Sequence, residues 1–323
     1  MDIHPENISV WLSWREAMHR ALYGEAGFYR RNLGARHFRT SVEATPRFAA
    51  ALRTLATGSV VDIGAGSGRL LTDLHRLGHT GLIAVEIGPR PAGLPAEIEW
   101  RDTLPETING LVVANEWLDN VPVDIVEQTA GGPRYVEVDP ETGDERLGDA
   151  PTEHDQAWLD RWWPLSTGER AEVGRPRDEA WADVIKRLEH GVAVAADYAH
   201  RQGARFESLT GYRDGQVVAA VPDGSRDITA HVALDACAEA GRTAGATDSV
   251  LTTQRDALRA LGITGVRPPL ALASTDPQHY LRELGRAGEE GELIDPDGLG
   301  GFGWLIQSVG GCLPAPLSAT MLG

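Results

Sequence analysis

The sequence predicts an α/β fold built around a doubly wound parallel sheet. Short apolar segments at 59–64, 81–87, 98–102 and 110–115 alternate with helical or loop patterns, and similar segments follow at 191–198, 248–253 and 303–309. Short apolar strands separated by crossovers are typical of parallel sheets covered by helices. A glycine-rich turn, VVDIGAGSGRLL at 60–71, follows the first segment and leads into a helical pattern. Such a strand, turn and helix start is typical of nucleotide-binding folds.

Two helical patterns precede the sheet. Residues 8–23 and 43–56 have apolar side chains at helical spacing, with a loop containing glycine, arginine and aromatic residues between them. We therefore expect an N-terminal helical cap and loop over 1–57 and a Rossmann-like core over 58–323. Insertions into the core are expected at about 123–190 and 199–247.

The insertions and the end of the chain have their own patterns. Segments 123–128 and 134–138 flank Gly131-Gly132 and predict a hairpin, while 157–190 reads as helices. Helices are expected around 231–242 and at 254–261, and compositionally biased runs near 238–246 and 285–303 predict loops.

Composition narrows the classes of function. The chain has 323 residues, 42% of them hydrophobic, and a formal net charge of −17 without a run of basic residues. We therefore expect neither nucleic acid nor a membrane surface as a partner. The polar start MDIHPENISV and the lack of an apolar stretch of about 20 residues lead us to expect a cytoplasmic protein. Cys237 and Cys312 lack metal-ligand spacing, so neither a disulfide framework nor a metal site is expected.

The spacing around the glycines indicates which nucleotide they hold. Dinucleotide sites space their glycines as G-x-G-x-x-G, whereas Gly64, Gly66 and Gly68 alternate here, and Asp62 lies two residues before the first of them. A carboxylate beside a helix start disfavours a pyrophosphate but favours the sulfonium and ammonium of S-adenosylmethionine. Glu86, about 20 residues on, would accept the ribose hydroxyls.

Three consecutive predicted strands end in acidic residues. Asp102, after the third, is placed to meet the adenine amino group, so Asp62, Glu86 and Asp102 line the edge at which open α/β sheets bind ligands. Taken singly, each has a plainer interpretation: Asp62 as a helix cap, the other two as solvated strand ends, and the glycines as an ordinary turn. Together they predict an S-adenosylmethionine site.

Further segments show a family resemblance. They are ALYGEAGFY (21–29), HFRTSVEA (37–44), VVANEWLDNVPVD (112–124), ADY (196–198), DITAHVALD (227–235) and QRDALRALGI (254–263). With the glycine turn, in this order, they resemble the MidA-like family of class I S-adenosylmethionine-dependent methyltransferases. That family includes the mitochondrial complex I assembly factor that dimethylates an arginine of a complex I subunit. The resemblance implies a Rossmann-like class I methyltransferase sheet with family-specific insertions, S-adenosyl-L-methionine as methyl donor and a protein substrate.

The resemblance also implies roles for individual residues. Those that match the loop that folds over the cofactor are Phe38, Thr40, Ser41 and Glu43. The glycines match the methionine-binding turn, Glu86 matches the ribose carboxylate, and Asn115 and Glu116 match the motif after the fourth strand. The chain departs from the family at Arg36-His37, at Val42, and at Gly215 in GYRDGQ, where a histidine is common.

The loop after the fourth strand holds the candidate catalytic residues. Glu116 and Asp119 could pin a guanidinium through its fork of donors, although first-turn acidic residues also stabilise helix starts. His231 could accept a proton, or could be an ordinary buried histidine at a helix start. Asp197 and Tyr198, at the end of the fifth strand, could line the acceptor pocket or simply be buried.

These observations predict a methyltransferase that N-methylates arginine in a protein. A small-molecule O-methyltransferase of a biosynthetic pathway and a non-catalytic S-adenosylmethionine-binding assembly protein are the alternatives. The acceptor is therefore a protein or a small molecule, and the oligomeric state, including a homo-oligomer, stays open.

Overall fold

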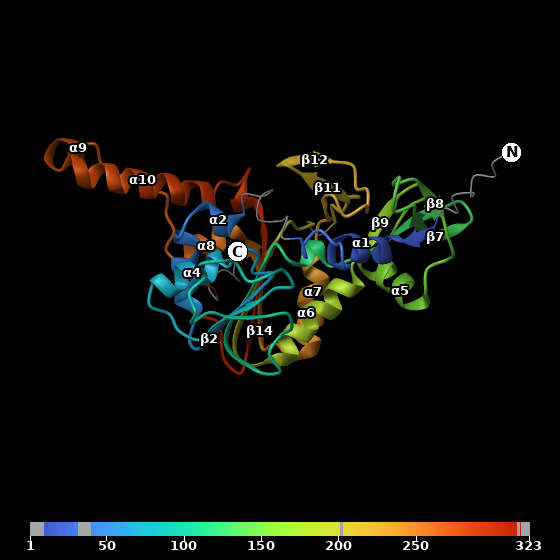
Figure 1. The fold of residues 1–323 in the computed structure, drawn as a ribbon, viewed down its shortest axis with the longest axis horizontal. Coiled ribbons are helices and arrows are strands. Elements are labelled where there is room, and N and C mark those ends of the chain that lie inside the picture. Colours follow the sequence, from blue (N-terminus) through green and yellow to red (C-terminus); the bar gives the residue numbers. More distant parts are fainter. Residues whose placement is uncertain (1–9, 32–39, 201–202, 315–316, 318–323) are drawn as a thin grey trace. The chain divides into compact units, whose positions relative to one another are not determined.

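The computed structural model describes residues 10–31, 40–200, 203–314 and 317 (Figure 1). The chain groups into two compact units. Unit 1 comprises Met1–His37, Asn120–Pro176 and Arg205–Ala230, and unit 2 comprises Phe38–Asp119, Arg177–Ala204 and His231–Gly323. This grouping differs from the ranges expected from the sequence, and those ranges stay a prediction. Within the described residues, no helix is both long and apolar enough to cross a membrane.

Unit 2 contains a seven-stranded sheet in the order β14-β15-β10-β5-β2-β3-β4. Its strands are β2 (Ser59–Ile63), β3 (Leu82–Val85), β4 (Glu99–Arg101), β5 (Ile108–Asn115), β10 (Leu188–Asp197), β14 (Asp248–Thr253) and β15 (Gly303–Val309). The five from β4 to β10 pair in parallel, and β15 pairs antiparallel with both β10 and β14. The predicted α/β fold is therefore confirmed, and the sheet, predicted as parallel, is parallel in five strands and antiparallel at β14 and β15.

Helices cover both faces of this sheet (Figure 1). One face packs against α3 (Arg47–Leu52), α4 (Arg69–Arg76) and α8 (Gln254–Ala260) in a single apolar core. The other face meets α6 (Arg175–Arg187) and α7 (Leu234–Ala244). There Gln307 of β15 accepts the Trp181 Nε1 proton at 2.7 Å and donates to the Ala238 carbonyl at 2.9 Å. Both faces are buried, which is why the strands read as nearly continuous apolar runs.

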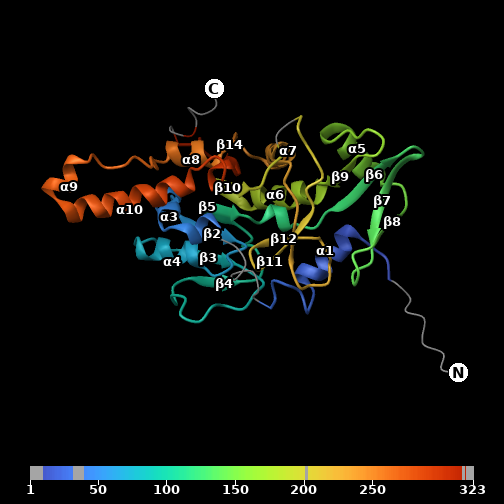
Figure 2. The same cartoon turned by 90° about the horizontal axis from the view of Figure 1, so that it is seen from above.

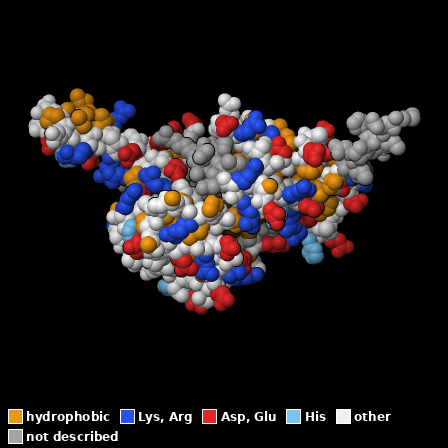
Figure 3. Space-filling model, viewed as in Figure 1, with side chains coloured by type: hydrophobic (Ala, Val, Ile, Leu, Met, Phe, Trp, Pro, Cys, Tyr) orange, Lys and Arg blue, Asp and Glu red, His pale blue; other side chains and the backbone are white. Residues whose placement is uncertain are grey.

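A helical arm of unit 2, which precedes β15 in the chain, corrects one expectation. The sequence predicted a loop over 285–303, but α9 (Ala271–Thr275) and α10 (Pro277–Leu293) form an arm that projects from this unit (Figures 1 and 2). Asp276 caps α10 by accepting the His279 N–H at 3.0 Å, and Pro277 occupies the first turn. Figure 3 shows apolar side chains gathered at the outer end of the arm, which carries the exposed Leu270 and Leu281.

A second expected loop is also partly helical. The run at 238–246 was predicted as a loop, but α7 continues to Ala244 and ends at Gly245, whose φ of 123° suits glycine. Two small residues of this run lie against β15: the Ala238 carbonyl accepts from Gln307, and a Cβ at Gly241 would meet the Gln307 Oε1 atom at 1.9 Å. The small residues that suggested a loop therefore allow α7 to pack closely against β15.

Unit 1 consists of two antiparallel sheets and short helices. The larger sheet has the order β1-β7-β6-β9, with β8 beside β7. Its strands are β1 (Leu12–Ser13), β6 (Asp124–Thr129), β7 (Gly132–Val138), β8 (Glu145–Leu147) and β9 (Arg170–Val173), and its helices are α1 (Trp14–Tyr23) and α5 (Glu153–Trp162). The predicted hairpin forms as β6 and β7, whereas the expected run of helices at 157–190 is interrupted by β9.

The smaller sheet of unit 1 was not anticipated. It has the order β12-β11-β13, formed by β11 (Thr210–Arg213), β12 (Gln216–Val218) and β13 (Asp227–Thr229). Asp214 and Gly215 join β11 to β12 with φ angles of 53° and 75°, which is the backbone of a two-residue hairpin turn. The glycine that departs from the family pattern at 215 therefore suits this turn.

Candidate functional site

The parallel strands of unit 2 end at one edge, and their register brings the predicted residues together there. Ile63 of β2 lies opposite Val85 of β3 and Ala114 of β5, and Asn115 lies opposite Ala196 of β10. The residues that follow each strand are therefore neighbours across the sheet. This is the edge at which doubly wound sheets bind ligands.

The glycine turn has the backbone that its sequence requires. Gly64, Gly66 and Gly68 have φ angles of 69°, 52° and 71°, in the left-handed region that favours glycine. A Cβ at Gly64 would meet Cδ1 of the Trp117 side chain at 3.3 Å. A Cβ at Gly66 would have only the Gly64 carbonyl oxygen, at 3.9 Å, within 4 Å. The turn is therefore open at Gly66, where a ligand could approach the backbone.

The Glu86 carboxylate folds onto this turn. One carboxylate oxygen accepts the Gly66 N–H at 2.9 Å and the other accepts the Gly88 N–H at 2.8 Å. These two bonds fix the carboxylate beside the open turn. Its remaining lone pairs can accept the hydroxyl protons of a ribose.

Asp62 is a buried acid beneath the turn. Asp62 is 4% exposed, and among the described residues no arginine or lysine forms an ion pair with its carboxylate. Burial, followed by the nearby Glu86 carboxylate, raises the pKa of Asp62 to about 8. A buried carboxylate of this kind suits a positively charged ligand, and the residues present thus fit the sulfonium and ammonium of S-adenosylmethionine.

The segment predicted to cover the cofactor begins a short helix, α2 (Ser41–Ala44). Thr40 caps it by accepting the Glu43 N–H at 3.3 Å, and Glu43 accepts a 2.6 Å hydrogen bond from the Ser67 hydroxyl in the glycine turn. Thr40, Ser41 and Glu43 therefore approach the turn although they lie more than 20 residues before it. Phe38 lies outside the described residues.

Ser41 joins this segment to the core. Its hydroxyl donates to Gln254 Oε1 at 3.0 Å, and its N–H donates to Glu116 Oε1 at 3.4 Å. Gln254 is fully buried, accepts the Trp304 Nε1 proton at 3.2 Å and donates to the Leu293 carbonyl at 3.1 Å. The sequence did not indicate a role for Gln254, although this residue opens the QRDALRALGI segment.

Glu116 has a strained backbone. Its φ of 53° is uncommon for a residue other than glycine, and such strain is concentrated at functional sites. Its N–H donates to the Ala196 carbonyl at 2.8 Å, and its carboxylate accepts from Asn115 Nδ2 at 2.9 Å. Asn115 Oδ1 is buried and has no hydrogen-bond partner within the described part of the chain. A ligand donor at this point would satisfy it.

A second buried acid supports the loop after β5. Asp197, at the end of β10, is 0% exposed, and one of its oxygens accepts the N–H groups of Leu118 and Asp119 at 2.9 and 3.3 Å. These residues form the short helix η3 (Leu118–Asn120). Burial, followed by the charge of Asp119, raises the pKa of Asp197 well above its usual range. The sequence placed Asp197 at a strand end but did not indicate that it holds this loop.

Arg177 of α6 was not predicted. Its guanidinium donates to the Asp119 carbonyl at 2.6 Å and to the His231 carbonyl at 2.8 Å. Its charge partly offsets the effect of the neighbouring carboxylates on the pKa of Asp197. Arg177 thus links the Asp119 loop to the segment that carries His231.

His231 belongs to the same part of unit 2. Its ring stacks on that of Tyr198, with 5.7 Å between the ring centroids. Burial, followed by the Arg177 charge, lowers the pKa of His231, so the imidazole is neutral near pH 7 and can accept a proton. Asp102 follows β4 and is exposed. Among the described residues, no group of acids, histidines and cysteines suits a metal ion.

Comparisons with known proteins agree with this architecture. Residues 84–252 match the model of a family described as "Putative S-adenosyl-L-methionine-dependent methyltransferase". A Burkholderia thailandensis protein crystallised with S-adenosylhomocysteine is 29% identical; the match covers 97% of this chain and 91% of that chain, with a TM-score of 0.75. A native crystal structure of an uncharacterized protein from the same organism has the same identity and TM-score, with 95% and 90% coverage. No curated protein matches the chain.

The matched family model spans just over half of the chain, and the solved relatives span nearly all of it. The chain belongs to the MidA-like family of class I S-adenosyl-L-methionine-dependent methyltransferases.

Proposed function

We propose that this methyltransferase N-methylates the guanidinium group of arginine in a protein substrate. The observation that carries the proposal is the gathering of Glu116, Asp119 and Asp197 at the ends of β5 and β10, close enough for the charges of the first two to raise the pKa of the third. Such a concentration of carboxylates favours a cationic acceptor. A guanidinium presents five donors that carboxylates can hold in fixed geometry.

We assign the cofactor to the neighbouring part of the same edge. Asp62 would lie near the charged amino acid portion of the cofactor, and the three glycines would let that portion approach the backbone closely. Glu86 would accept hydrogen bonds from the ribose hydroxyls. The covering residues would be Thr40, Ser41 and Glu43, with Phe38 before them in the sequence. Asp102 would meet the adenine amino group, and Asn115, at the end of β5, would also contact the cofactor. When bound, S-adenosylmethionine supplies a methyl group made electrophilic by its positive sulfur.

The proposed chemistry needs alignment and one proton acceptor. The acceptor nitrogen forms a bond to the methyl carbon while the carbon–sulfur bond breaks and leaves its electron pair on sulfur. Glu116 would hold the guanidinium so that the attacking nitrogen lies in line with that bond. The nitrogen must also lose one proton, and the neutral His231 imidazole is the proposed acceptor.

A second candidate, O-methylation of a small molecule, is favoured by one observation. A neutral histidine beside an aromatic ring would suit the deprotonation of a hydroxyl group, and His231 stacked on Tyr198 fits that description. The carboxylates near Asp197 would have no clear role with a neutral alcohol. We therefore rank this candidate second.

The two candidates can be separated by the labelled product. Purified protein and S-adenosylmethionine with an isotopic methyl group are incubated with an extract of cells that lack the gene, with a Glu116→Gln variant in parallel. Mass spectrometry that finds label on arginine of a protein, and loses it with the variant, supports the proposal. Label found only on small-molecule hydroxyl groups would replace it with the second candidate.

A further inference from the structure

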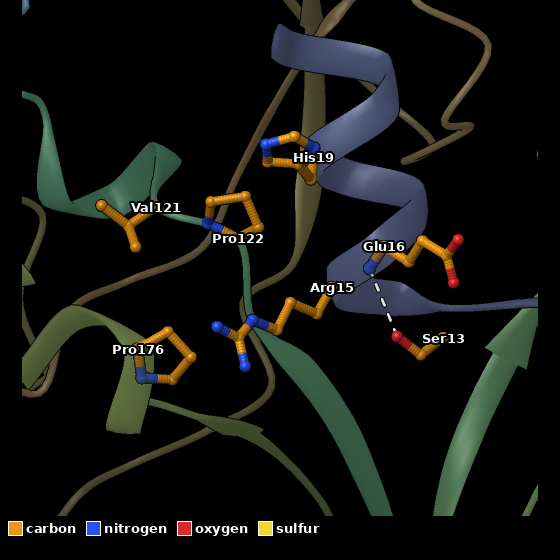
Figure 4. A pocket seen from close by; sticks show the side chains of 7 residues that line it. All are labelled: Ser13, Arg15, Glu16, His19, Val121, Pro122 and Pro176. Atoms are coloured by element: carbon orange, nitrogen blue, oxygen red, sulfur yellow. Dashed lines mark hydrogen bonds between the residues drawn. The ribbon is translucent and has the colours of Figure 1, made fainter. Parts of the chain in front are cut away.

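Unit 1 contains a cavity of about 370 Å³ beside the start of α1 (Figure 4). It is lined by Ser13, Arg15, Glu16, His19, Val121, Pro122 and Pro176. None of these is among the residues assigned above to the cofactor or to the methyl acceptor. The volume lies at the lower end of the range for small-molecule sites, and it exceeds the space that a carboxylate group alone would fill.

Two side chains bring nitrogen atoms to this cavity. The Arg15 guanidinium reaches toward Val121 and Pro176, and the His19 ring lies one helical turn further along α1, beside Pro122 (Figure 4). Both residues are exposed. Within the described residues, the Arg15 guanidinium makes no hydrogen bond and no ion pair. Its donors are therefore available to a ligand.

The backbone that carries these side chains is firmly held. Asp124 accepts the Arg15 N–H at 3.1 Å, and Ser13 caps α1 by accepting the Glu16 N–H at 3.2 Å. The opposite face of α1 is buried through Trp14 and Ala17. Arg15 and His19 are four residues apart, so they project from one face of a fixed helix.

Within the described residues, neither Glu16 nor Asp124 forms an ion pair with the Arg15 guanidinium. The Glu16 carboxylate points away from the Arg15 guanidinium (Figure 4). One Asp124 oxygen accepts the Arg15 N–H, and burial raises the pKa of Asp124 while the nearby Arg15 charge opposes that rise. The chain has a net charge of −17, so most of it repels anions. This cavity, with a guanidinium and an imidazole, is a local site that can attract one.

The remaining walls define the rest of the ligand. Val121, Pro122 and Pro176 present apolar side chains, and the two prolines have no backbone N–H to donate. A strongly hydrated anion such as phosphate would lose hydration against these walls without new partners. A carboxylate joined to a short apolar stem would place its oxygens on the guanidinium fork and its carbon atoms on the prolines.

We propose that this cavity binds an organic carboxylate with an apolar stem, held by Arg15 and contacted by His19. The ligand could be a free carboxylic acid or an acidic side chain of a peptide, because both present the same group. The proposal does not rest on the methyl-transfer acceptor assigned above.

The test compares hexanoate with hexanamide, its neutral counterpart, by ligand-detected NMR. The experiment is run with the full chain and saturating S-adenosylhomocysteine, so that the cofactor site is filled. We expect hexanoate to bind at least fivefold more tightly than hexanamide. The Arg15→Gln variant should abolish this difference, and the Arg20→Gln variant, which changes an exposed arginine of α1 outside the cavity lining, should retain it.

A second arm distinguishes the two sources. The peptide acetyl-Leu-Glu-Leu-amide is compared with its Gln counterpart under the same conditions. Tighter binding of the Glu peptide than of hexanoate supports a peptide ligand, and binding of hexanoate alone supports a free acid. Equal binding of hexanoate and hexanamide to the wild-type chain would overturn the proposal, as would a preference that survives in a folded Arg15→Gln variant.

Discussion

At the residue scale, two acids beside the glycine turn differ in their hydrogen bonding and in their pKa. Glu86 is held by two backbone N–H groups, whereas Asp62 is buried and its pKa is raised to about 8. Without a ligand, the charge of Asp62 is a cost to the folded protein. A cationic ligand would turn this cost into binding energy, since it would supply the missing opposite charge.

Replacing Asp62 by asparagine should therefore change stability and binding in opposite directions. The folded protein keeps a proton on Asp62 up to about pH 8, while the unfolded chain loses it near its usual value of 3.8. The stability that this group contributes is thus fully present below pH 3.8 and is lost as the pH rises to about 8. At pH 8 we expect Asp62→Asn to stabilise the ligand-free protein by at least about 1 kcal/mol, or about 2–4 °C in Tm.

The measurement is thermal unfolding of wild type and variant at pH 5 and pH 8, together with calorimetry of S-adenosylmethionine binding. The gain in Tm should be larger at pH 8, and binding by the variant should be at least about tenfold weaker, equivalent to about 1.4 kcal/mol. The same gain in Tm at both pH values would show that the pKa of Asp62 is not raised.

At the element scale, the glycine turn leaves its backbone open to a ligand, and α2 lies beside the turn. Gly66 has a left-handed φ and open space around its missing side chain. Gly78, just beyond α4, shares both properties but lies at the other end of that helix. Comparing substitutions at Gly66 and Gly78 therefore distinguishes the effect of backbone strain, which both share, from the effect of filling the space for a ligand.

We expect Gly66→Val to abolish S-adenosylmethionine binding and Gly78→Val to leave it intact. Both variants force a β-branched residue to a positive φ and should lose similar stability, about 1–3 kcal/mol. Circular dichroism checks folding and calorimetry measures binding. If folded Gly66→Val binds the cofactor as well as Gly78→Val does, then the turn is not where the cofactor approaches.

The attachment of α2 to the core gives another prediction. Gln254→Leu removes the partner of the Ser41 hydroxyl, of Trp304 Nε1 and of the Leu293 carbonyl, so it should lower the free energy of unfolding by about 1–3 kcal/mol. Ser41→Ala removes one hydroxyl and leaves the other two bonds of Gln254, so it should cost less. Both should weaken cofactor binding, because both loosen the covering segment. Urea unfolding and calorimetry test this, and unchanged binding in both variants would contradict a covering role for α2.

At the scale of the whole molecule, the sequence predicted the sheet well because buried parallel strands give simple apolar runs. All seven predicted strands of the sheet form, and their register gathers Gly64, Glu86 and Glu116 at one edge. Strand ends are readable from the sequence since an apolar run stops where the polar residue begins.

The helix α10, the short strands of unit 1 and several buried polar residues could not be predicted from the sequence, for physical reasons. The glycines of α10 reduce helix propensity, but Asp276 caps the helix and Arg286 pairs with Glu290 at 2.7 Å to stabilise it. The strands β9 and β11 to β13 have only three or four residues each, which is too few to give a clear pattern in the sequence. Gln254, Arg177 and Asp197 act through buried hydrogen bonds to residues far away in the chain, and such partners leave no local pattern.

In the proposed reaction, Glu116 orients the methyl acceptor and contributes little to cofactor affinity. An acid that acts on the acceptor is needed for the transition state, so Glu116→Gln should reduce turnover by about 100-fold or more, equivalent to about 2.7 kcal/mol. Glutamine has nearly the same volume and can still accept from Asn115 and Ser41 through its carbonyl oxygen.

The most direct test measures both quantities side by side for wild type and Glu116→Gln, with S-adenosylmethionine affinity by calorimetry and methyl transfer to the acceptor identified by isotope labelling. We expect the variant to bind S-adenosylmethionine within about threefold of wild type and to lose at least about 100-fold in turnover. Full turnover in the variant, or a loss of affinity as large as the loss of turnover, would contradict it.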